Sequence, residues 1–352
     1  MIFKSIEILR YKNISKINIK PERINFIVGE NGSGKTSLLD AFYYCAHGKS
    51  FISSDVRHQI QYNESDFNLI TKIKNNNNEL KVAYNKNTKI KKIKINNKNI
   101  QRQSDITKHI PLKTLHPNSI LLINGQESHR RDFVNWGLFH MKHSFNDIWS
   151  KYLQTLKQRN NSLKTKEISL IQVWDNKLSF LSQEIDNLRL EYIEILTQTI
   201  QQYTQKFFVK EVSIVYYRGW RQGVELLENL KKEINNDIKK GWTGVGPHKF
   251  SLKIMHNNNE CRYNFSRGQQ KILSYCLVLA QIKLLEVVTG KISVLLIDDI
   301  LSELDQKNTM TILKIIKKLN NQVFLSSISY TKELKSVKNH KMFHMKQGSI
   351  II

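Results

Sequence analysis

The first hundred residues alternate apolar and polar positions with the period of β-strands. This alternation marks residues 2–9, 17–19 and 24–28, and the last run leads into a glycine-rich loop and then a helix expected at 35–46. Residues 67–96 contain three further strand-like runs broken by asparagine-rich turns. We expect these three runs to form a meander that flanks the glycine-rich loop.

Between residues 127 and 208 the apolar period changes from that of a strand to that of a helix. Apolar residues recur at steps of three and four, as on one face of a helix, in two stretches. The later stretch comprises Ile171, Trp174, Leu178, Leu181, Ile185, Leu188, Tyr192 and Ile195. The earlier stretch comprises Phe145, Trp149, Tyr152, Leu156 and Leu163. Such helices can pair as an antiparallel hairpin with arms of about 40 Å. Two ordinary amphipathic helices in a compact lobe explain the pattern at least as well, so the pattern leaves both arrangements open.

After residue 240 the chain returns to alternating strands and helices. Strands are expected at 250–255, 293–297 and 322–326, and helices at 269–288 and 309–319. Strands that alternate with helices indicate an α/β fold. We predict a head in which residues 1–110 and 241–352 form a mixed sheet flanked by helices, with residues 111–240 inserted as a mainly helical lobe that carries a short helical hairpin.

The chain is strongly basic, with 55 Lys and Arg against 30 Asp and Glu and a formal net charge of +25. The excess is +11 in residues 1–110 and +9 in 241–352, but +4 in 141–240. A basic excess favours a polyanionic partner such as DNA. Asn, Lys and Ile are also abundant in evident loops, as drift in base composition would produce, so part of the charge has no functional meaning.

The remaining composition points to a cytoplasmic protein. The N-terminal segment MIFKSIEILRYKNI has no apolar signal-peptide region, and no run approaches the roughly 20 apolar residues of a membrane helix. The three cysteines, Cys45, Cys261 and Cys276, lack the spacing of a metal site, so we expect reduced, buried thiols.

One segment carries the chemistry of nucleotide binding. It is Gly29-Glu30-Asn31-Gly32-Ser33-Gly34-Lys35-Thr36, which fits the phosphate-loop pattern GxxxxGK[ST] between a strand and a helix. Backbone N–H groups of such a loop surround the phosphates of ATP, Lys35 reaches the β and γ phosphates, and Thr36 binds Mg²⁺. The segment therefore predicts ATP and Mg²⁺ as cofactors.

An acidic pair follows a second buried strand. The apolar run 294–297 ends in Asp298 and Asp299, at the strand end where such a pair would face the phosphates. We expect Asp298 to hold Mg²⁺ through water, and Asp299 to orient or deprotonate the water that attacks ATP. Together with the phosphate loop, this pair predicts ATP hydrolysis with Asp299 and Lys35 as catalytic residues.

The segment FSRGQQK places Ser266, Arg267, Gly268 and Gln269 at a helix N-terminus, which is an anion-binding arrangement. It resembles the signature motif of ABC-type ATPases, in which the signature of one subunit closes on the nucleotide of the other. This resemblance implies an ATP-dependent homodimer. It also matches Ser302, Glu303 and Asp305 to the D-loop at the dimer interface, and Ser327 to the catalytic switch residue that senses the γ-phosphate.

Within that superfamily the chain resembles the RecF family, which is related to the SMC proteins, over nearly its whole length. The residues that carry the resemblance are RYKNI at 10–14, GENGSGKTSLLDAFYYCAHGKSF at 29–51, HRRDFVNWGLFH at 129–140, LKQRN at 156–160, GPHK at 246–249, SRGQQK at 266–271 and IDDILSELD at 297–305. The resemblance implies an ABC-type head, slow DNA-stimulated ATP hydrolysis, and action in DNA replication and repair. It implies recognition of single-strand gaps, with RecR, RecO and RecA as partners.

Two departures from the family pattern affect individual site residues. The resemblance matches Lys12 and Asn13 to a basic residue and an asparagine beside the nucleotide base, but Lys12 stands where arginine is usual. The segment His116-Pro117-Asn118 stands where the family has Pro-Glu. The residue that senses Mg²⁺ in the Q-loop therefore stays open.

Three other functions are compatible with some of these motifs. An SMC-like or RecN-like structural protein needs hundreds of residues of coiled coil, which an insert of about 100 residues does not provide. A transporter ATPase is disfavoured by the insert and by the family-specific segments. A scaffold that uses ATP only to dimerise, with negligible hydrolysis, stays open because motifs do not set the geometry around Asp299.

Overall fold

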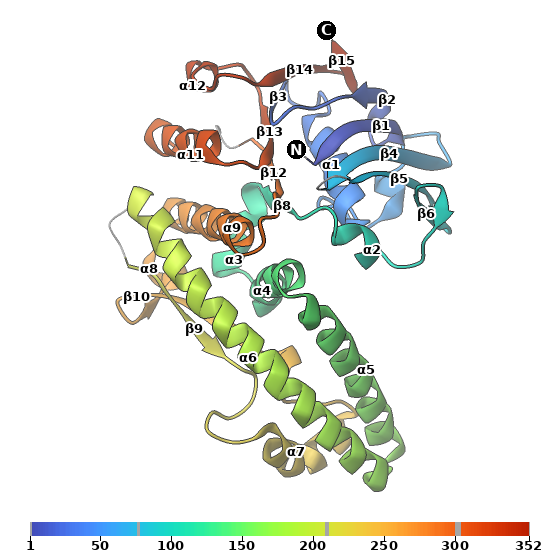
Figure 1. Cartoon of the computed structure of the whole chain (residues 1–352), viewed down its shortest axis with the longest axis vertical. Helices are drawn as coiled ribbons and strands as arrows, with labels where there is room; N and C mark the ends of the chain where they lie inside the picture. Colours follow the sequence, from blue (N-terminus) through green and yellow to red (C-terminus); the bar gives the residue numbers. More distant parts are fainter. Residues whose placement is uncertain (1, 76–77, 208–210, 300–303, 352) are drawn as a thin grey trace. The chain divides into compact units, whose positions relative to one another are not determined.

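The computed structural model describes residues 2–75, 78–207, 211–299 and 304–351. The chain divides into two compact units, which are residues 1–119 with 285–352, and residues 120–284 (Figure 1). The first unit contains the phosphate loop at residues 29–36, and we call this unit the head. The second is mainly helical, and we call it the lobe. The mixed α/β fold predicted from the sequence is confirmed.

The head contains two six-stranded sheets. One is mainly parallel, in the order β15-β14-β3-β13-β12-β8, and the other is antiparallel, in the order β2-β1-β4-β5-β6-β7. The parallel sheet consists of β3 (Ile24–Val28), β8 (Leu112–Leu115), β12 (Val294–Ile297), β13 (Gln322–Ser327), β14 (Lys341–Lys346) and the antiparallel edge strand β15 (Ser349–Ile351). The antiparallel sheet consists of β1 (Phe3–Tyr11), β2 (Ile14–Ile19), β4 (Asp66–Asn75), β5 (Asn78–Asn87), β6 (Lys91–Ile95) and β7 (Lys98–Asn99). The head helices are α1 (Lys35–His47), α2 (Ser104–Thr107), α11 (Gln306–Lys318) and α12 (Lys332–Lys335).

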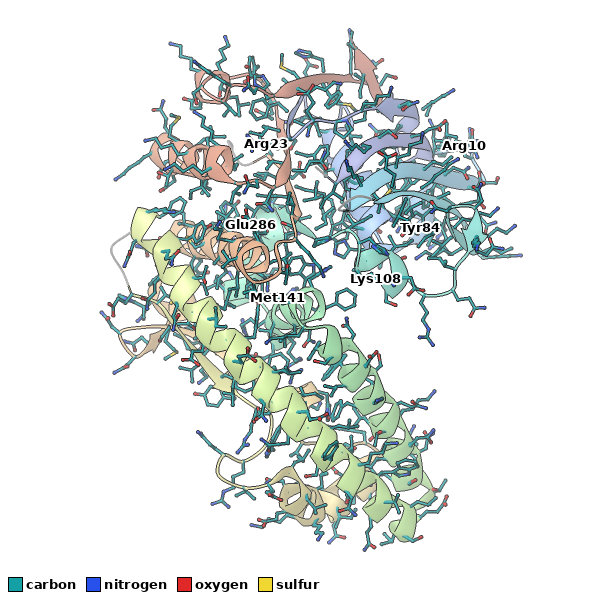
Figure 2. All side chains as sticks on the ribbon, viewed as in Figure 1. Arg10, Arg23, Tyr84, Lys108, Met141 and Glu286 are labelled. Carbon is teal, nitrogen blue, oxygen red and sulfur yellow. The ribbon has the colours of Figure 1, made fainter. Side chains whose placement is uncertain are left out.

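Helix α1 packs in the core between the two sheets, because its apolar side chains contact both. The ring of Phe42 lies 4.9 Å from that of Phe3 on β1 and 4.1 Å from that of Phe324 on β13. Tyr84 of β5, labelled in Figure 2, donates its hydroxyl to the carbonyl oxygen of Cys45 at 3.1 Å. These contacts fix the position of α1, the helix that follows the phosphate loop.

The lobe consists mainly of helices. They are α3 (Leu121–Asn124), α4 (Glu127–Met141), α5 (His143–Thr165), α6 (Ile168–Phe207), α7 (Leu226–Lys240), α8 (Cys261–Asn264) and the first part of α9 (Arg267–Thr289). A small sheet in the order β11-β10-β9 combines β9 (Ser213–Tyr217), β10 (Ser251–His256) and β11 (Asn259–Glu260). Helices α5 and α6 pack along each other as a hairpin, which is one of the two arrangements that the sequence left open, and α7 packs against both of them. Since α6 has 40 residues, it is about 60 Å long, which is longer than the predicted arms.

The boundaries of the two units differ from those expected at residues 110/111 and 240/241. Strand β8 belongs to the head because Leu112–Leu115 pairs in parallel with β12. Residues 241–284 belong to the lobe because β10 pairs with β9. In addition, Gln281 of α9 donates to the carbonyl oxygen of Phe133 at 2.8 Å and to the hydroxyl of Tyr192 at 2.5 Å. These long-range pairings are not visible in a local sequence pattern.

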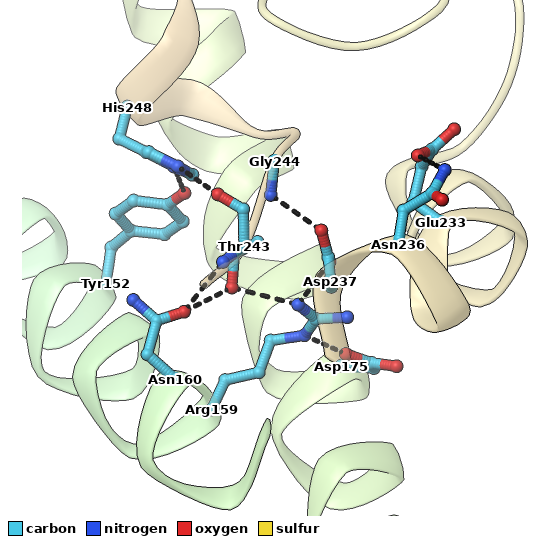
Figure 3. A network of polar contacts seen from close by, with 10 residues as sticks. All are labelled: Tyr152, Arg159, Asn160, Asp175, Glu233, Asn236, Asp237, Thr243, Gly244 and His248. Carbon is cyan, nitrogen blue, oxygen red and sulfur yellow. Dashed lines mark hydrogen bonds and ion pairs between the residues drawn. The ribbon is translucent and has the colours of Figure 1, made fainter. Parts of the chain in front are cut away.

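A buried network of ion pairs and hydrogen bonds holds the lobe together (Figure 3). It gives a structural role to two of the family segments, LKQRN and GPHK. Arg159 is fully buried and donates to Asp175 at 2.5 Å, to Asp237 at 2.6 Å and to Thr243 at 2.9 Å. These residues come from α5, α6, α7 and the loop that follows α7. Asn160 accepts from the backbone N–H of Thr243 at 2.9 Å. The segment LKQRN therefore joins the helical hairpin to the rest of the lobe.

His248 of the segment GPHK lies at the edge of this network in one defined neutral form. Its Nε2 lies 3.1 Å from the carbonyl oxygen of Thr243, which can only accept, so Nε2 carries the proton. Its Nδ1 therefore accepts from the hydroxyl of Tyr152 at 2.6 Å. Burial lowers the pKa of His248 to about 4.

We expect the stability of the lobe to fall as the pH is lowered. The folded pKa of His248, about 4, is below its ordinary value. Its contribution is therefore complete above about pH 6.5 and is lost as the pH falls toward 4, by about 1 to 2 kcal/mol at pH 5. Thermal unfolding midpoints measured from pH 7.5 to pH 5 test this. The variant His248→Gln, which does not titrate, should decline less steeply, and equal slopes would contradict the assignment.

Of the helices in the described part of the chain, one is long and apolar enough by length and composition to span a membrane. It is α9, and 72% of its most apolar stretch is buried inside the protein. A buried core helix has the same composition as a membrane span, so this helix is weak support for a membrane segment.

Candidate nucleotide site

The phosphate loop connects β3 to α1, as predicted. All five residues of β3 are buried, and α1 begins at Lys35. Gly34 has φ of 107°, a conformation that an L side chain rarely adopts. At Gly29, a Cβ atom would clash with the backbone of Met345 on β14. Gly29 and Gly34 are therefore required for the path of the loop.

Lys35 lies within the loop and is only 7% exposed. Its ammonium donates to the carbonyl oxygens of Gly29 at 2.7 Å and Glu30 at 2.9 Å. An ammonium has three N–H donors, so these two acceptors leave one donor for a phosphate oxygen. The loop thus holds a positive charge at the position where phosphates would lie.

Asp298 lies at the carboxyl end of β12 and faces the start of α1. Its Oδ1 accepts from the hydroxyl of Thr36 at 3.2 Å and from that of Ser326 at 2.6 Å. Thr36 and Asp298 are the oxygen donors predicted to hold Mg²⁺, and oxygen ligands are those that Mg²⁺ prefers. The two side chains are 262 positions apart in the sequence and are brought together by the sheet order.

Asp299 has φ of 50°, a left-handed conformation that is uncommon for a residue other than glycine. Its backbone N–H donates to the hydroxyl of Ser326 at 2.9 Å. Ser326 therefore contacts both acidic residues, since the same hydroxyl donates to Asp298. Backbone conformations of this kind cluster at functional sites.

A cavity of about 350 Å³ joins these groups. It is lined by Lys12, Asn13, Asn31, Gly32, Gly34, Lys35, Thr36, Ser37, Asp298 and Asp299. All except Ser37 were predicted site residues, and they come from the β1–β2 turn, the phosphate loop with the start of α1, and the end of β12. The fold therefore brings the separated head segments to one cavity.

Lys12 is anchored at the cavity by a carboxylate that sequence reasoning missed. Asp40 of α1 is fully buried, and it accepts from Lys12 Nζ at 2.7 Å and from the hydroxyls of Tyr11 and Ser50 at 2.7 Å each. It also accepts from the backbone N–H of Phe51 at 2.8 Å. Burial and the Asp40 carboxylate raise the pKa of Tyr11, so its hydroxyl keeps the proton that it donates. Asp40 thereby ties the turn that carries Lys12 to the helix after the phosphate loop.

Two serines at the end of β13 have different surroundings. Ser327, the predicted switch residue, is 2% exposed, and its hydroxyl donates to the carbonyl oxygen of Ser329 at 2.8 Å. Its own carbonyl oxygen accepts from the backbone N–H of Gly29 at 3.2 Å. Ser326, which the sequence did not single out, is the residue whose hydroxyl contacts Asp298.

His116 lies beside the acidic pair, at the end of β8. The carbonyl oxygen of Leu115 next to it accepts from the backbone N–H of Asp298 at 2.8 Å. Burial lowers the pKa of His116, and the Asp298 carboxylate opposes this shift. Asn118 is exposed. Among the described residues, no group of three or more His, Cys, Asp or Glu side chains could hold a metal ion by itself.

The signature segment lies in the lobe, at the N-terminus of α9. Ser266, Arg267 and Gly268 are exposed. The backbone N–H of Ser266 donates to Gln269 Oε1 at 3.0 Å, and the N–H of Gln269 donates to the Ser266 hydroxyl at 3.3 Å. This reciprocal pair is a capping box, which defines the start of the helix and leaves the segment open to solvent.

The predicted D-loop falls partly outside the described residues, which do not include Ser302 and Glu303. Asp305 is described, and its carboxylate accepts from the backbone N–H of Asn308 at 2.8 Å. It therefore caps the N-terminus of α11.

Known proteins are similar to this chain over nearly its whole length. The family model described as "RecF/RecN/SMC N terminal domain" matches residues 2–351. The DNA replication and repair protein RecF of Mannheimia succiniciproducens is 34% identical over 348 residues, covering 97% of this chain and 96% of that protein. The RecF protein of Haemophilus influenzae is 33% identical over 359 residues, covering 99% of each chain.

Solved structures are similar over the same length. A structure of the recombination mediator protein RecF with ATP, from the RecFOR pathway, has a TM-score of 0.88 and 25% identity, covering 99% of this chain and 97% of that one. An Smc head domain from Pyrococcus furiosus has a TM-score of 0.62 and 13% identity, covering 99% of this chain and 94% of that one, which is a likeness of fold alone.

Proposed function

The chain belongs to the RecF family, and we propose that it is an ATP-dependent DNA-binding protein of recombinational repair and replication. In this proposal, ATP joins two copies into a dimer that clamps DNA at single-strand gaps and aids the loading of RecA. Slow, DNA-stimulated hydrolysis of ATP then resets the protein. RecR and RecO are the expected partners, and the cytoplasm is the expected location.

One observation carries the proposal, which is the cavity that joins Lys35, Thr36 and the acidic pair. Lys35 would neutralise the β and γ phosphates, while Thr36 and Asp298 would hold Mg²⁺. Mg²⁺ would supply charge neutralisation on the phosphate oxygens. Asp299 would orient or deprotonate the attacking water. Lys12, held by Asp40, would lie beside the nucleotide base together with Asn13.

Dimerisation is supported by the exposed signature segment. Ser266, Arg267 and Gly268 lie at the N-terminus of a 23-residue helix, where backbone N–H groups and the helix dipole favour an anion. The phosphate loop of the same chain is far from this segment in the sequence. The γ-phosphate bound by a second copy would fit it, so that ATP joins the two copies.

We expect ATP with Mg²⁺ and duplex DNA to shift the full-length protein from monomer to dimer. Lys35→Ala should abolish the shift because it removes the ammonium from the phosphates. Ser266→Arg should also abolish it because a long side chain would block the signature segment. Light scattering with and without ATP measures the mass.

The matched control for the second variant is Asn235→Arg, which adds the same side chain at an exposed position of α7. It should dimerise as the unaltered protein does. If the unaltered protein keeps the mass of a monomer in the presence of ATP and DNA, the clamp proposal is refuted.

A further inference from the structure

The antiparallel sheet of the head carries a concentrated positive charge. Residues 66–99, which include β4 to β7, contain nine lysines and two acidic residues. The lysines are Lys72, Lys74, Lys81, Lys86, Lys89, Lys91, Lys92, Lys94 and Lys98. Of the two acids, Asp66 is already paired with Arg10 at 2.6 Å, and Glu79 of β5 is exposed opposite Lys74 of β4. The nucleotide cavity uses none of these residues.

The pleat of the sheet sorts these side chains by face. The inner face is apolar and buried, and includes Ile73, Val82, Tyr84 and Ile93. The alternate positions lie on the opposite face, where Lys72, Lys81, Lys92 and Lys94 are exposed. We call this opposite face of β4, β5 and β6 the outer face. Figure 1 shows the three strands side by side.

On the outer face, lysines stand next to lysines. Lys72 of β4 is directly opposite Lys81 of β5, and Lys94 of β6 is opposite Ala83, which makes it the diagonal neighbour of Lys81. The Cβ atoms of opposed residues on paired strands are about 5 Å apart, and like charges directly opposite each other destabilise a sheet. None of these three lysines forms an ion pair with a described residue.

A general abundance of lysine does not account for this arrangement. Helix α7 (Leu226–Lys240) has four lysines, but it also has three acidic residues. Helix α11 has four lysines and no acid, so the number of lysines alone does not distinguish the meander. The outer face differs because Lys72 and Lys81 are directly opposite each other, where their charges repel. An anionic partner would remove that repulsion, because it neutralises adjacent ammonium groups together.

We propose that the outer face of β4, β5 and β6 binds the phosphate backbone of duplex DNA. This inference rests on the proposed function, and it names the surface that the DNA contacts. Lysines on long flexible side chains act as point charges toward phosphates, and the face presents a row of them across neighbouring strands. Contacts of this kind position DNA without reading its bases, so the binding should be independent of sequence.

The test compares two variants of the full-length protein with ATP and Mg²⁺ present. The face variant is Lys72→Gln/Lys81→Gln/Lys94→Gln. The control variant is Lys307→Gln/Lys314→Gln/Lys318→Gln, which removes three exposed lysines from α11 of the same unit. Affinity for a labelled 40-base-pair duplex is measured from 50 to 200 mM salt. Circular dichroism checks that both variants fold.

Three lost phosphate contacts should lower the slope of log affinity against log salt by about 2.7. The ratio of wild-type to face-variant affinity should therefore fall about 40-fold between 50 and 200 mM salt. The control variant should keep the wild-type slope, and ATP hydrolysis without DNA should be unchanged in both.

Two results would overturn the inference, and they can be told apart. If the face variant keeps the wild-type affinity and slope, the surface is wrong while the proposed function stands. If the unaltered protein binds vesicles of anionic lipid but no duplex, and the face variant loses the vesicle binding, the outer face is a membrane surface and the proposed function fails as well.

Discussion

Replacing Asp299 with Asn should stop the release of phosphate from ATP while leaving ATP-dependent dimers intact. Asp299 lines the same cavity as Lys35 and Thr36, and its backbone is held in a left-handed conformation by a bond to Ser326. The amide has nearly the same shape as the carboxylate, so ATP binding should persist. The amide cannot accept a proton from water, and the loss of a general base lowers reaction rates by about 10² to 10⁴-fold.

The measurement pairs phosphate release in the presence of DNA with the mass of the protein in ATP. Asp147→Asn is the control, because it makes the same chemical change at an exposed position of α5. If the unaltered protein and the Asp299→Asn variant release phosphate equally slowly, ATP serves only to join the copies. The protein would then be an ATP-gated scaffold with negligible hydrolysis.

Replacing Arg159 with Met should destabilise the lobe by about 3 to 5 kcal/mol, which is the usual cost of leaving buried charges without their partner. Arg159 is fully buried, and it bridges Asp175 on α6 to Asp237 on α7 (Figure 3). Methionine fills much of the space but leaves both carboxylates unpaired. Chemical denaturation followed by circular dichroism measures the loss.

The control is Lys142→Met, which breaks the pair of Lys142 with Glu191 in the same lobe. That pair is largely exposed, so its loss should cost less than about 1 kcal/mol. The loss in Arg159→Met should also shrink as the pH is lowered. Burial raises the pKa of Asp175, and protonation removes the unpaired charge. Equal losses in the two variants would show that the network does not hold the lobe together.

The short-range features of the nucleotide site could be predicted because each is written in consecutive residues. A strand, a glycine-rich loop and a helix follow one another from Ile24 to His47, and local pattern is enough to identify them. The buried strand before Asp298 is of the same kind. In both cases, apolar period and turn chemistry act over a few residues, so no knowledge of the packing was needed.

The outcome was different for groups whose partners are distant in the chain. Asp40 looks like an ordinary polar position on α1, yet it is buried beneath Lys12 and Ser50. Arg159 falls on the apolar face of its helix, between Leu156 and Leu163, but nothing near it in the sequence indicates its partner Asp237. A charged side chain is buried only where its partner also arrives, and that arrival depends on how the helices pack.

The sequence by itself determined the family, the α/β class, and the phosphate loop with its acidic pair. It did so because these features depend on the spacing of apolar residues and on motifs of consecutive residues. Only the tertiary structure decided that Ser326 contacts Asp298 and that residues 241–284 belong to the lobe. It also decided that Lys72, Lys81 and Lys94 share one outer face. Strand pairing and register are long-range choices, and they alone set which distant side chains become neighbours.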